Sequence, residues 1–286
     1  MSWPSLWLAR EMRFGIHLPQ FGRAAVAGAV EQAASRAEEL GFDDVWVSDH
    51  LVIPKDQAYP GPYLYDPLIS LAFAACATSR VGLGTSVLVG PQYTSPLALA
   101  NTLSTLDNMS RGRLTVGIGI GWSKAEYEAL HAPFDHRGAR LDEIIDVFRS
   151  AWRDDPSSHD GPYYAFQSIR VLPKPGHDIP IWVGGTSDAA YNRAFRQADG
   201  YHGIGVKSQD ARALVERIRA ARPEDTFTIS LRVSWDTATV SPDDIRAQRE
   251  GYEAAGIQHL LVTPERGDAD AWLAGMAATA EALGLG

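Results

Sequence analysis

Near its start the chain reads Gly41-Phe42-Asp43-Asp44-Val45-Trp46-Val47-Ser48-Asp49-His50, and this stretch decides the fold. The apolar run Val45–Val47 predicts a short buried strand. The strand ends in Ser48, followed by a carboxylate, Asp49, and an imidazole, His50. In an α/β barrel, catalytic groups gather at the carboxyl ends of the strands. The same residues also suit an ordinary polar turn in which Asp49 caps a backbone amide, so the other strand ends must decide.

The rest of the chain repeats this pattern of an apolar run followed by a helical segment. The predicted strands are residues 13–18, 45–47, 81–88, 114–119, 179–183, 200–204, 226–233 and 259–263. The predicted helices are 24–40, 66–78, 95–109, 124–130 with 137–153, one ending at 197, 208–221, 241–256 and 268–283. Continuous apolar strands indicate burial on both faces, and strict alternation with helices indicates a parallel sheet. Eight such units predict an α/β fold of the closed (β/α)8 TIM barrel type rather than an open doubly wound sheet.

One segment interrupts the alternation. Residues 154–178 contain two extended stretches, 160–164 and 169–172, which predict a hairpin inserted between strands four and five. No linker divides the chain, so we expect a single domain over residues 1–286. Residues 1–11 are expected to be an N-terminal extension, because the first strand begins directly after Met12, a candidate natural start.

The composition limits the function classes. The chain of 286 residues has a net charge of -9, which argues against a nucleic-acid partner. One cysteine excludes an internal disulfide framework, and its place in an apolar helical run predicts that Cys76 is a buried structural thiol. No apolar stretch reaches the length of a membrane span, and residues 1–11 lack the features of a secretory signal. We therefore expect a cytoplasmic protein that acts on a small molecule, without a membrane partner.

Two glycine clusters follow predicted strands. Gly184-Gly185-Thr186-Ser187 opens a helix, whose free amides and dipole suit a phosphate group, although a plain N-cap gives the same pattern. Gly117, Gly119 and Gly121 lack the spacing of the dinucleotide fingerprint. They either let a planar ligand approach the backbone or let neighbouring strands pack closely.

Four motifs together resemble the bacterial luciferase-like flavin and deazaflavin oxidoreductases. They are Ser48-Asp49-His50, Leu83-Gly84-Thr85-Ser86-Val87, Gly112-Arg113-Leu114 running into Gly117-Ile118-Gly119-Ile120-Gly121-Trp122, and Pro180-Ile181-Trp182-Val183-Gly184-Gly185. The motifs fall in order at matching strand ends, and the resemblance extends from about Arg13 to Gly205. The Asp49-His50 pair resembles the branch that uses the deazaflavin coenzyme F-420.

The resemblance implies where a cofactor would bind. The ring would lie in the barrel mouth beside Gly119 and against a bulge formed by Thr85, Ser86 and Val87, with a non-proline cis peptide at Ser86-Val87. Asp49 matches the residue that hydrogen-bonds the ring, and His50 matches a residue that is catalytic in sugar-phosphate dehydrogenases of the family. Gly184, Gly185 and Thr186 match the segment that holds the cofactor phosphate.

One residue departs from those dehydrogenases, which carry an acidic glutamate where this chain has Trp122. An indole cannot transfer a proton, so we expect an apolar or aromatic substrate stacked on Trp122 rather than a sugar phosphate. The alternative is that Trp122 is only a core or rim aromatic.

Other polar residues are weaker candidates. We expect His17 to fill the core, whereas His202, at a strand end, is a candidate contact for the cofactor's phosphate tail. Arg137, Arg140, Asp142 and Glu143 are expected to form a solvated helix face. No set of histidines and carboxylates has convincing metal-ligand spacing, so we expect no metal.

The residues therefore predict an oxidoreductase that transfers a hydride between F-420 and an organic substrate, with His50 handling the accompanying proton. An FMN-dependent monooxygenase that uses O2 and a non-catalytic flavin- or deazaflavin-binding protein are the alternatives. A homodimer is also predicted, through apolar surface on helix 95–109 that includes Leu97, Ala98, Leu99, Ala100 and Leu103.

Overall fold

The predicted apolar runs form a closed parallel sheet in the computed structural model, which describes residues 12–57, 63–264 and 267–286. The barrel strands are β1 (Arg13–His17), β2 (Asp44–Val47), β3 (Gly82–Thr85) with β4 (Leu88–Val89), β5 (Leu114–Gly119), β8 (Ile181–Gly184), β9 (Gly200–Ile204), β10 (Thr228–Ser234) and β11 (His259–Thr263). Neighbours pair in parallel, and β1 pairs with both β2 and β11, which closes the ring. The (β/α)8 barrel is confirmed. The expected extension at residues 1–11 lies outside the described residues.

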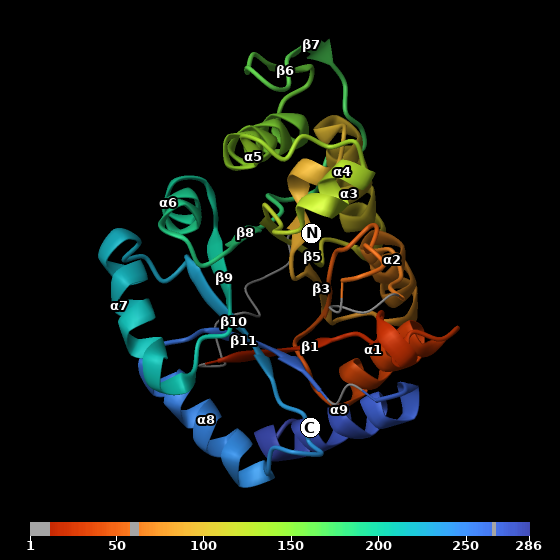
Figure 1. Cartoon of the computed structure of the whole chain (residues 1–286), viewed down its shortest axis with the longest axis vertical. Helices are drawn as coiled ribbons and strands as arrows, with labels where there is room; N and C mark the ends of the chain where they lie inside the picture. Colours follow the sequence, from red (N-terminus) through yellow and green to blue (C-terminus); the bar gives the residue numbers. More distant parts are fainter. Residues whose placement is uncertain (1–11, 58–62, 265–266) are drawn as a thin grey trace.

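Helices surround the sheet (Figure 1). They are α1 (Ala29–Glu39), α2 (Pro67–Ala77), α3 (Pro96–Ser110), α4 (Lys124–Ala129), α5 (Arg137–Arg153), α6 (Asp188–Gln197), α7 (Ala211–Ala221), α8 (Pro242–Ala255) and α9 (Ala269–Leu283), with short 3-10 turns η2 (Gly22–Ala24), η3 (Gly90–Gln92) and η4 (Ser208–Asp210). Several start with a capping side chain followed by proline, as at Ser95-Pro96. None of the described helices is long and apolar enough to cross a membrane.

The largest errors in the predicted element boundaries are at three places. Strand 81–88 is interrupted at the cis peptide Ser86–Val87, which separates β3 from β4. The first helix begins at Ala29 rather than residue 24, because the 3-10 turn η2 and the left-handed Gly28 precede it. The inserted hairpin uses β6 (Ser157–His159) and β7 (Phe166–Ile169), since Gly161-Pro162 lies in their connection rather than in a strand. Figure 1 shows this hairpin projecting beyond α5.

Two expectations about helix faces were also wrong. Cys76 is exposed, because α2 turns Leu71 and Ala74 toward the barrel and Cys76 away from it. Three residues of α3 that were expected to offer shared apolar surface are buried against the barrel instead: Leu99, Ala100 and Leu103.

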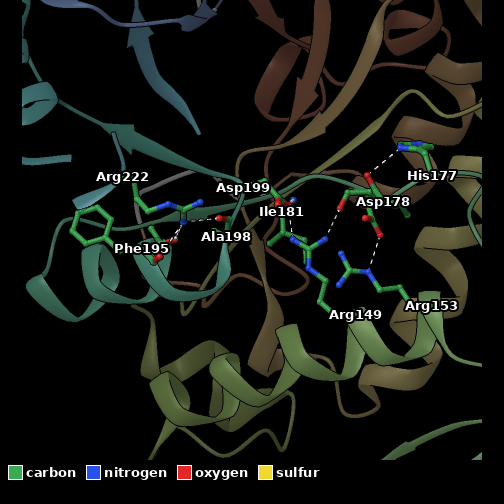
Figure 2. A network of polar contacts seen from close by, with 11 residues as sticks. Arg149, Arg153, His177, Asp178, Ile181, Phe195, Ala198, Asp199 and Arg222 are labelled. Carbon is green, nitrogen blue, oxygen red and sulfur yellow. Dashed lines mark hydrogen bonds and ion pairs between the residues drawn. The ribbon is translucent and has the colours of Figure 1, made fainter. Parts of the chain in front are cut away.

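Polar contacts fix the amino end of the barrel, as Figure 2 shows. Arg149 of α5 forms an ion pair with Asp199, which precedes β9 and also accepts a hydrogen bond from the backbone N–H of Ile181 at 2.8 Å. Arg222, after α7, donates to the carbonyls of Phe195 and Ala198 at 2.9 and 3.1 Å. These contacts tie helices to the strand starts, at the end of a barrel that typically serves stability.

The barrel interior contains large rings beside glycines. The indoles of Trp46 and Trp182 stack with their centroids 5.3 Å apart. A Cβ on Gly84 would lie 2.3 Å from the Trp46 ring, and one on Gly200 would lie 2.7 Å from Trp182. Each glycine therefore provides the volume that a facing indole occupies.

Candidate active site

The strand ends that carried the sequence motifs meet at one mouth of the barrel. β4 pairs with β5 through Val89 and Gly119, and β5 pairs with β8. The side chain of Val87 fills the space beside two glycines, because a Cβ on Gly119 would lie 2.9 Å, and one on Gly184 3.0 Å, from its methyl groups. The bulge at Ser86–Val87 thus lies against the ends of β5 and β8, and the expected cis peptide is present.

Asp49 is buried at this mouth, and only one of its two carboxylate oxygens has a hydrogen-bond partner among the described residues. Its Oδ2 accepts hydrogen bonds from the N–H of Val89 at 2.8 Å and the hydroxyl of Tyr93 at 3.2 Å. Its buried Oδ1 has no hydrogen-bond partner among the described residues. Burial raises the pKa of Asp49 to about 6, although the bonds from Val89 and Tyr93 act in the opposite direction. A buried carboxylate oxygen without a partner fits an N–H donor of a bound ring.

His50 contacts a carboxylate that the sequence analysis missed. Its Nδ1 lies 2.8 Å from Oε1 of Glu126. Glu126 is buried and also accepts hydrogen bonds from Gln57 at 2.8 Å and Gln92 at 3.3 Å. Burial alone would raise the pKa of Glu126, but hydrogen bonds from His50 and the glutamines outweigh burial and lower it. The ionised carboxylate places a proton on Nδ1 and leaves Nε2 of a neutral His50 able to accept one.

Trp122 marks the rim beside this pair. Its side chain is 60% exposed, which excludes a place in the core. Its ring meets that of His50 edge to face, with centroids 6.3 Å apart. The one available signal for Glu126 was its position four residues after Trp122, in the first turn of a helix capped by Ser123.

The glycines after β8 open the start of α6. Gly185 has a φ of 130°, a conformation that side chains other than glycine rarely adopt. Ser187 caps the helix by accepting from the N–H of Ala190 at 3.2 Å, so the plain N-cap is present. Gly185 and Thr186 remain exposed before it, where amides at a helix start suit a phosphate.

Two other predicted residues have structural partners. The hydroxyl of Thr85 is buried and donates to the carbonyl of Gly117 at 2.8 Å. A Cβ on Gly117 would lie 1.9 Å from the carbonyl oxygen of Thr85, so close strand packing requires this glycine. The side chain of Thr85 therefore forms its hydrogen bond within the barrel wall.

Both histidines on other strands lie inside the barrel. His17 is buried, as expected, with Nε2 2.8 Å from the Ser48 hydroxyl. His202 was a candidate for the phosphate tail, but it is buried against the bulge, with Nε2 2.8 Å from the Ser86 hydroxyl. Its place within β9 turns the ring inward, where both ring nitrogens already have hydroxyl partners, Ser86 and Ser230.

The expected solvated face of α5 was only partly correct. Glu143 is buried and accepts hydrogen bonds from the backbone N–H groups of Tyr163 and Tyr164 in the insertion. Asp142 forms an ion pair with Arg193 of α6. Among the described residues, no group of three or more potential ligands could hold a metal ion.

A cavity of about 530 Å³ lies at the ends of β9 and β10, at the same end of the barrel as the bulge. It is lined by residues from the ends of β9 and β10, from η4 and from α8, including Ile204, Lys207, Trp235 and Tyr252. Arg232 lines it as well and connects it to the mouth, because its Nη1 donates to the Ser48 hydroxyl at 2.9 Å and to the Ser86 carbonyl at 3.3 Å.

Comparisons with known proteins agree with this arrangement. An uncharacterised protein of Mycobacterium tuberculosis is 32% identical over 205 residues, which are 66% of this chain and 71% of that protein. The F-420-dependent glucose-6-phosphate dehydrogenase of Kineococcus radiotolerans is 31% identical over 221 residues, 73% of this chain and 64% of the relative. Further dehydrogenases of that name are matched over about half of their length, 50 to 55%.

Two solved structures share the fold. The monooxygenase RslO1 of Streptomyces bottropensis is 24% identical with a TM-score of 0.80, over 95% of this chain and 98% of that chain. An F-420-dependent secondary alcohol dehydrogenase, solved with an F-420-acetone adduct, is 18% identical with the same TM-score and coverage. The profile of the luciferase-like monooxygenase family matches residues 12–237, and the chain belongs to that family.

Proposed function

We propose that the protein is an oxidoreductase that transfers a hydride between coenzyme F-420 and an organic substrate. The buried Oδ1 of Asp49, which has no partner in the described part of the chain, carries the proposal, because it provides an acceptor where a ring with an N–H donor would lie. The relatives named for F-420 support this choice of cofactor. The deazaflavin, when bound, supplies the hydride chemistry, and the protein supplies orientation and proton handling.

Each part of the mouth has a role in this proposal. Asp49 hydrogen-bonds the ring, the bulge at Ser86–Val87 supports it beside Gly119, and the segment Gly184–Thr186 holds the cofactor phosphate. These assignments are supported by the shared mouth and by the exposed amides before α6.

His50 moves the proton that accompanies hydride transfer. Glu126 fixes the proton on Nδ1, so Nε2 accepts a proton from the substrate in one direction of the reaction and returns it in the other. Trp122 stands where the related dehydrogenases have an acidic glutamate. In this chain the carboxylate of Glu126 takes its place by acting through the imidazole of His50. Glu126 is a positioning residue, because it contacts His50 rather than the reacting atoms.

The substrate we propose is apolar or aromatic. Trp122 presents an exposed ring beside His50, and Ile204 contributes apolar surface to the cavity at the ends of β9 and β10. Stacking on the exposed indole and apolar contact would hold such a substrate.

An FMN-dependent monooxygenase that uses O2 is the second candidate, favoured by the structural likeness to RslO1. The two candidates differ in kind, because a deazaflavin has carbon at position 5 and does not form the oxygen adduct of a flavin. A protein that only binds the cofactor would have no need of the buried His50–Glu126 pair.

The first prediction tests the cofactor. Titration of the purified protein with F-420 and with FMN, followed by fluorescence quenching, should show saturable binding of F-420 at a concentration at least about tenfold lower than FMN. A tenfold difference corresponds to about 1.4 kcal/mol, roughly one well-placed hydrogen bond. Tighter binding of FMN would favour the monooxygenase.

The second prediction concerns His50. His50→Asn should lower turnover by about 10²–10⁴-fold while cofactor affinity changes only a few-fold, because the variant loses the proton carrier but keeps the ring site. Turnover would be found first with a panel of alcohols, enones, quinones and nitroaromatics.

Glu126 supplies a related comparison. Glu126→Gln can donate to Nδ1 and favour the wrong tautomer of His50, so turnover should also fall and its pH profile should shift. Glu128→Gln, at an exposed position of the same helix, is the matched control and should behave like the parent. Parental turnover in His50→Asn would remove the catalytic assignment.

The third prediction concerns Asp49, whose pKa of about 6 lies above the ordinary 3.8. A carboxyl with a raised pKa in the folded state destabilises the fold progressively as pH rises from about 4 to 6, and the cost persists above that range. The rise in pKa from 3.8 to about 6 lowers the free energy of unfolding by at most about 3 kcal/mol, because a tenfold change in proton affinity corresponds to about 1.4 kcal/mol.

Asp49→Asn keeps the acceptor for Val89 and Tyr93 without the charge. The free energy of unfolding of this variant, minus that of the parent, should therefore increase between about pH 4 and pH 6 and then level off. Its amide would replace the free acceptor with a donor, so F-420 should bind roughly ten- to a hundredfold more weakly. Denaturant unfolding at several pH values and the same titration measure both effects, and a pH-independent difference in stability would contradict the burial argument.

The fourth prediction concerns assembly. We propose a homodimer through a face of α2 on which Ile69 and Phe73 are 62% and 52% exposed. Exposed apolar residues that share a helix face mark association surfaces. Light scattering should show a dimer of the 31.1 kDa chain, and Phe73→Lys should shift it toward monomer. Ile169→Lys, at an exposed apolar residue of β7 in the inserted hairpin, is the control. Equal sizes for parent and Phe73→Lys would remove this interface.

A further inference from the structure

A continuous line of buried polar side chains runs through the barrel interior beneath the bulge. Asp44 Oδ1 lies 3.0 Å from His259 Nε2, and His259 Nδ1 lies 2.6 Å from the Ser230 hydroxyl. The Ser230 hydroxyl lies 2.7 Å from His202 Nδ1, and His202 Nε2 lies 2.8 Å from the Ser86 hydroxyl. Asp44 begins β2 at the amino end, and Ser86 follows β3 at the mouth. Ser86 is half-buried, and the other four residues are buried.

The acid at the inner end is ionised. Burial would raise the pKa of Asp44, but the charge and hydrogen bond of His259 and the charge of Arg13 outweigh burial and lower it. The indole N–H of Trp46 also donates to Asp44 Oδ1. An ionised carboxylate only accepts, so His259 must donate to it through Nε2.

His202, in the middle, stays neutral. Burial, together with the positive charges of His259 and Arg232, lowers its pKa to about 3. A neutral imidazole carries one proton, so His202 donates through one nitrogen and accepts through the other. It can pass a proton on but not hold a second one.

These constraints leave two complete arrangements of the hydrogen bonds. With neutral His259, every donor points inward: Ser86 donates to His202, His202 to Ser230, and Ser230 to His259. With His259 as imidazolium, these three bonds reverse while His259 still donates to Asp44 through Nε2, and the Ser86 hydroxyl proton points into the mouth. No donor or acceptor in the line is lost in either arrangement, and the two differ by one proton.

We propose that the line Ser86–His202–Ser230–His259–Asp44 is a proton relay that stores one proton from the barrel mouth as a buried His259–Asp44 ion pair. A proton arrives on Ser86 Oγ while the original hydroxyl proton moves to His202 Nε2. The proton of His202 Nδ1 moves to Ser230, and that of Ser230 moves to His259 Nδ1. Each O–H or N–H bond that breaks is matched by one that forms, and no electrons are transferred.

The relay deepens the proposed function. Only one part of it rests on that function, namely that the stored proton comes from the hydride-transfer reaction. Hydride transfer between a ring and an organic substrate leaves one proton to be placed, and His50 handles protons beside Trp122 at the rim. Ser86 would give the mouth a second exchange point, on the bulge itself. The titratable and charged groups that face the inner pair are Arg13, His202 and, through His202, Arg232.

The test uses the cofactor-free protein, so it does not depend on the proposed function. Nitrogen-15 NMR of the histidine rings would be followed as pH is lowered, with His202→Gln and His259→Gln spectra for assignment. As His259 takes up a proton, His202 should change from the Nδ1–H to the Nε2–H tautomer with the same midpoint and without becoming charged. A His202 tautomer that stays constant over the range in which the protein is folded would overturn the relay.

Ser230→Ala interrupts the line in its middle. In that variant the tautomer of His202 should no longer follow His259, so the two midpoints separate. Ser104→Ala is the matched control, because Ser104 is equally buried but donates to a helix carbonyl of α3, and it should keep the parental coupling. If Ser230→Ala does not fold, Ser230→Cys, which keeps a donor of similar size, should retain a weakened coupling. If the His202 tautomer still follows the protonation of His259 in folded Ser230→Ala, the two rings are connected by another route and the proposal is overturned.

Discussion

Parallel pairing of β1 with β11 closes the sheet, and every later feature of the molecule depends on this closure. A closed parallel sheet turns the carboxyl ends of all its strands toward one mouth. Asp49 after β2, Ser86 after β3 and Gly184 at the end of β8 therefore meet, although they are far apart in the chain. Glu126 reaches the same mouth from α4, which follows β5. In an open sheet these residues would be spread along an edge several strands wide.

Closure also buries polar groups that must find partners inside the barrel. A typical hydrogen bond contributes only about 0.5–1.5 kcal/mol net, but a buried group left without a partner costs about 1–3 kcal/mol. The interior meets this requirement with lines of side chains that end at the bulge. His202 contacts the hydroxyl of Ser86, and Arg232 contacts its carbonyl. The residue proposed to support the cofactor is thus held from below by two independent strands, β9 and β10.

Local patterns predicted much of the fold, because strand burial and helix capping depend on near neighbours in the chain. The cap-then-proline starts and the boundaries of β5, β9, β11 and α5 follow from such patterns. Errors arose where an outcome depends on contacts distant in sequence. Cys76 lies in an apolar run, but which face of α2 meets the barrel is a tertiary property. Glu126 lies 76 residues from its partner, and an acid in a helix gives no sign of burial until that helix is placed over a barrel mouth.

The glycines that face indoles in the barrel link distant positions in another way. Gly84 and Trp46 share one volume between neighbouring strands, and Gly200 and Trp182 share another. Neither member of such a pair can change size alone, since a methyl group at Gly84 would overlap the ring and a smaller residue at Trp46 would open a void. The two positions are therefore bound to evolve as one unit: related chains that lose the tryptophan should gain bulk at the glycine, and the exchange must pass through an intermediate that is either overfilled or hollow.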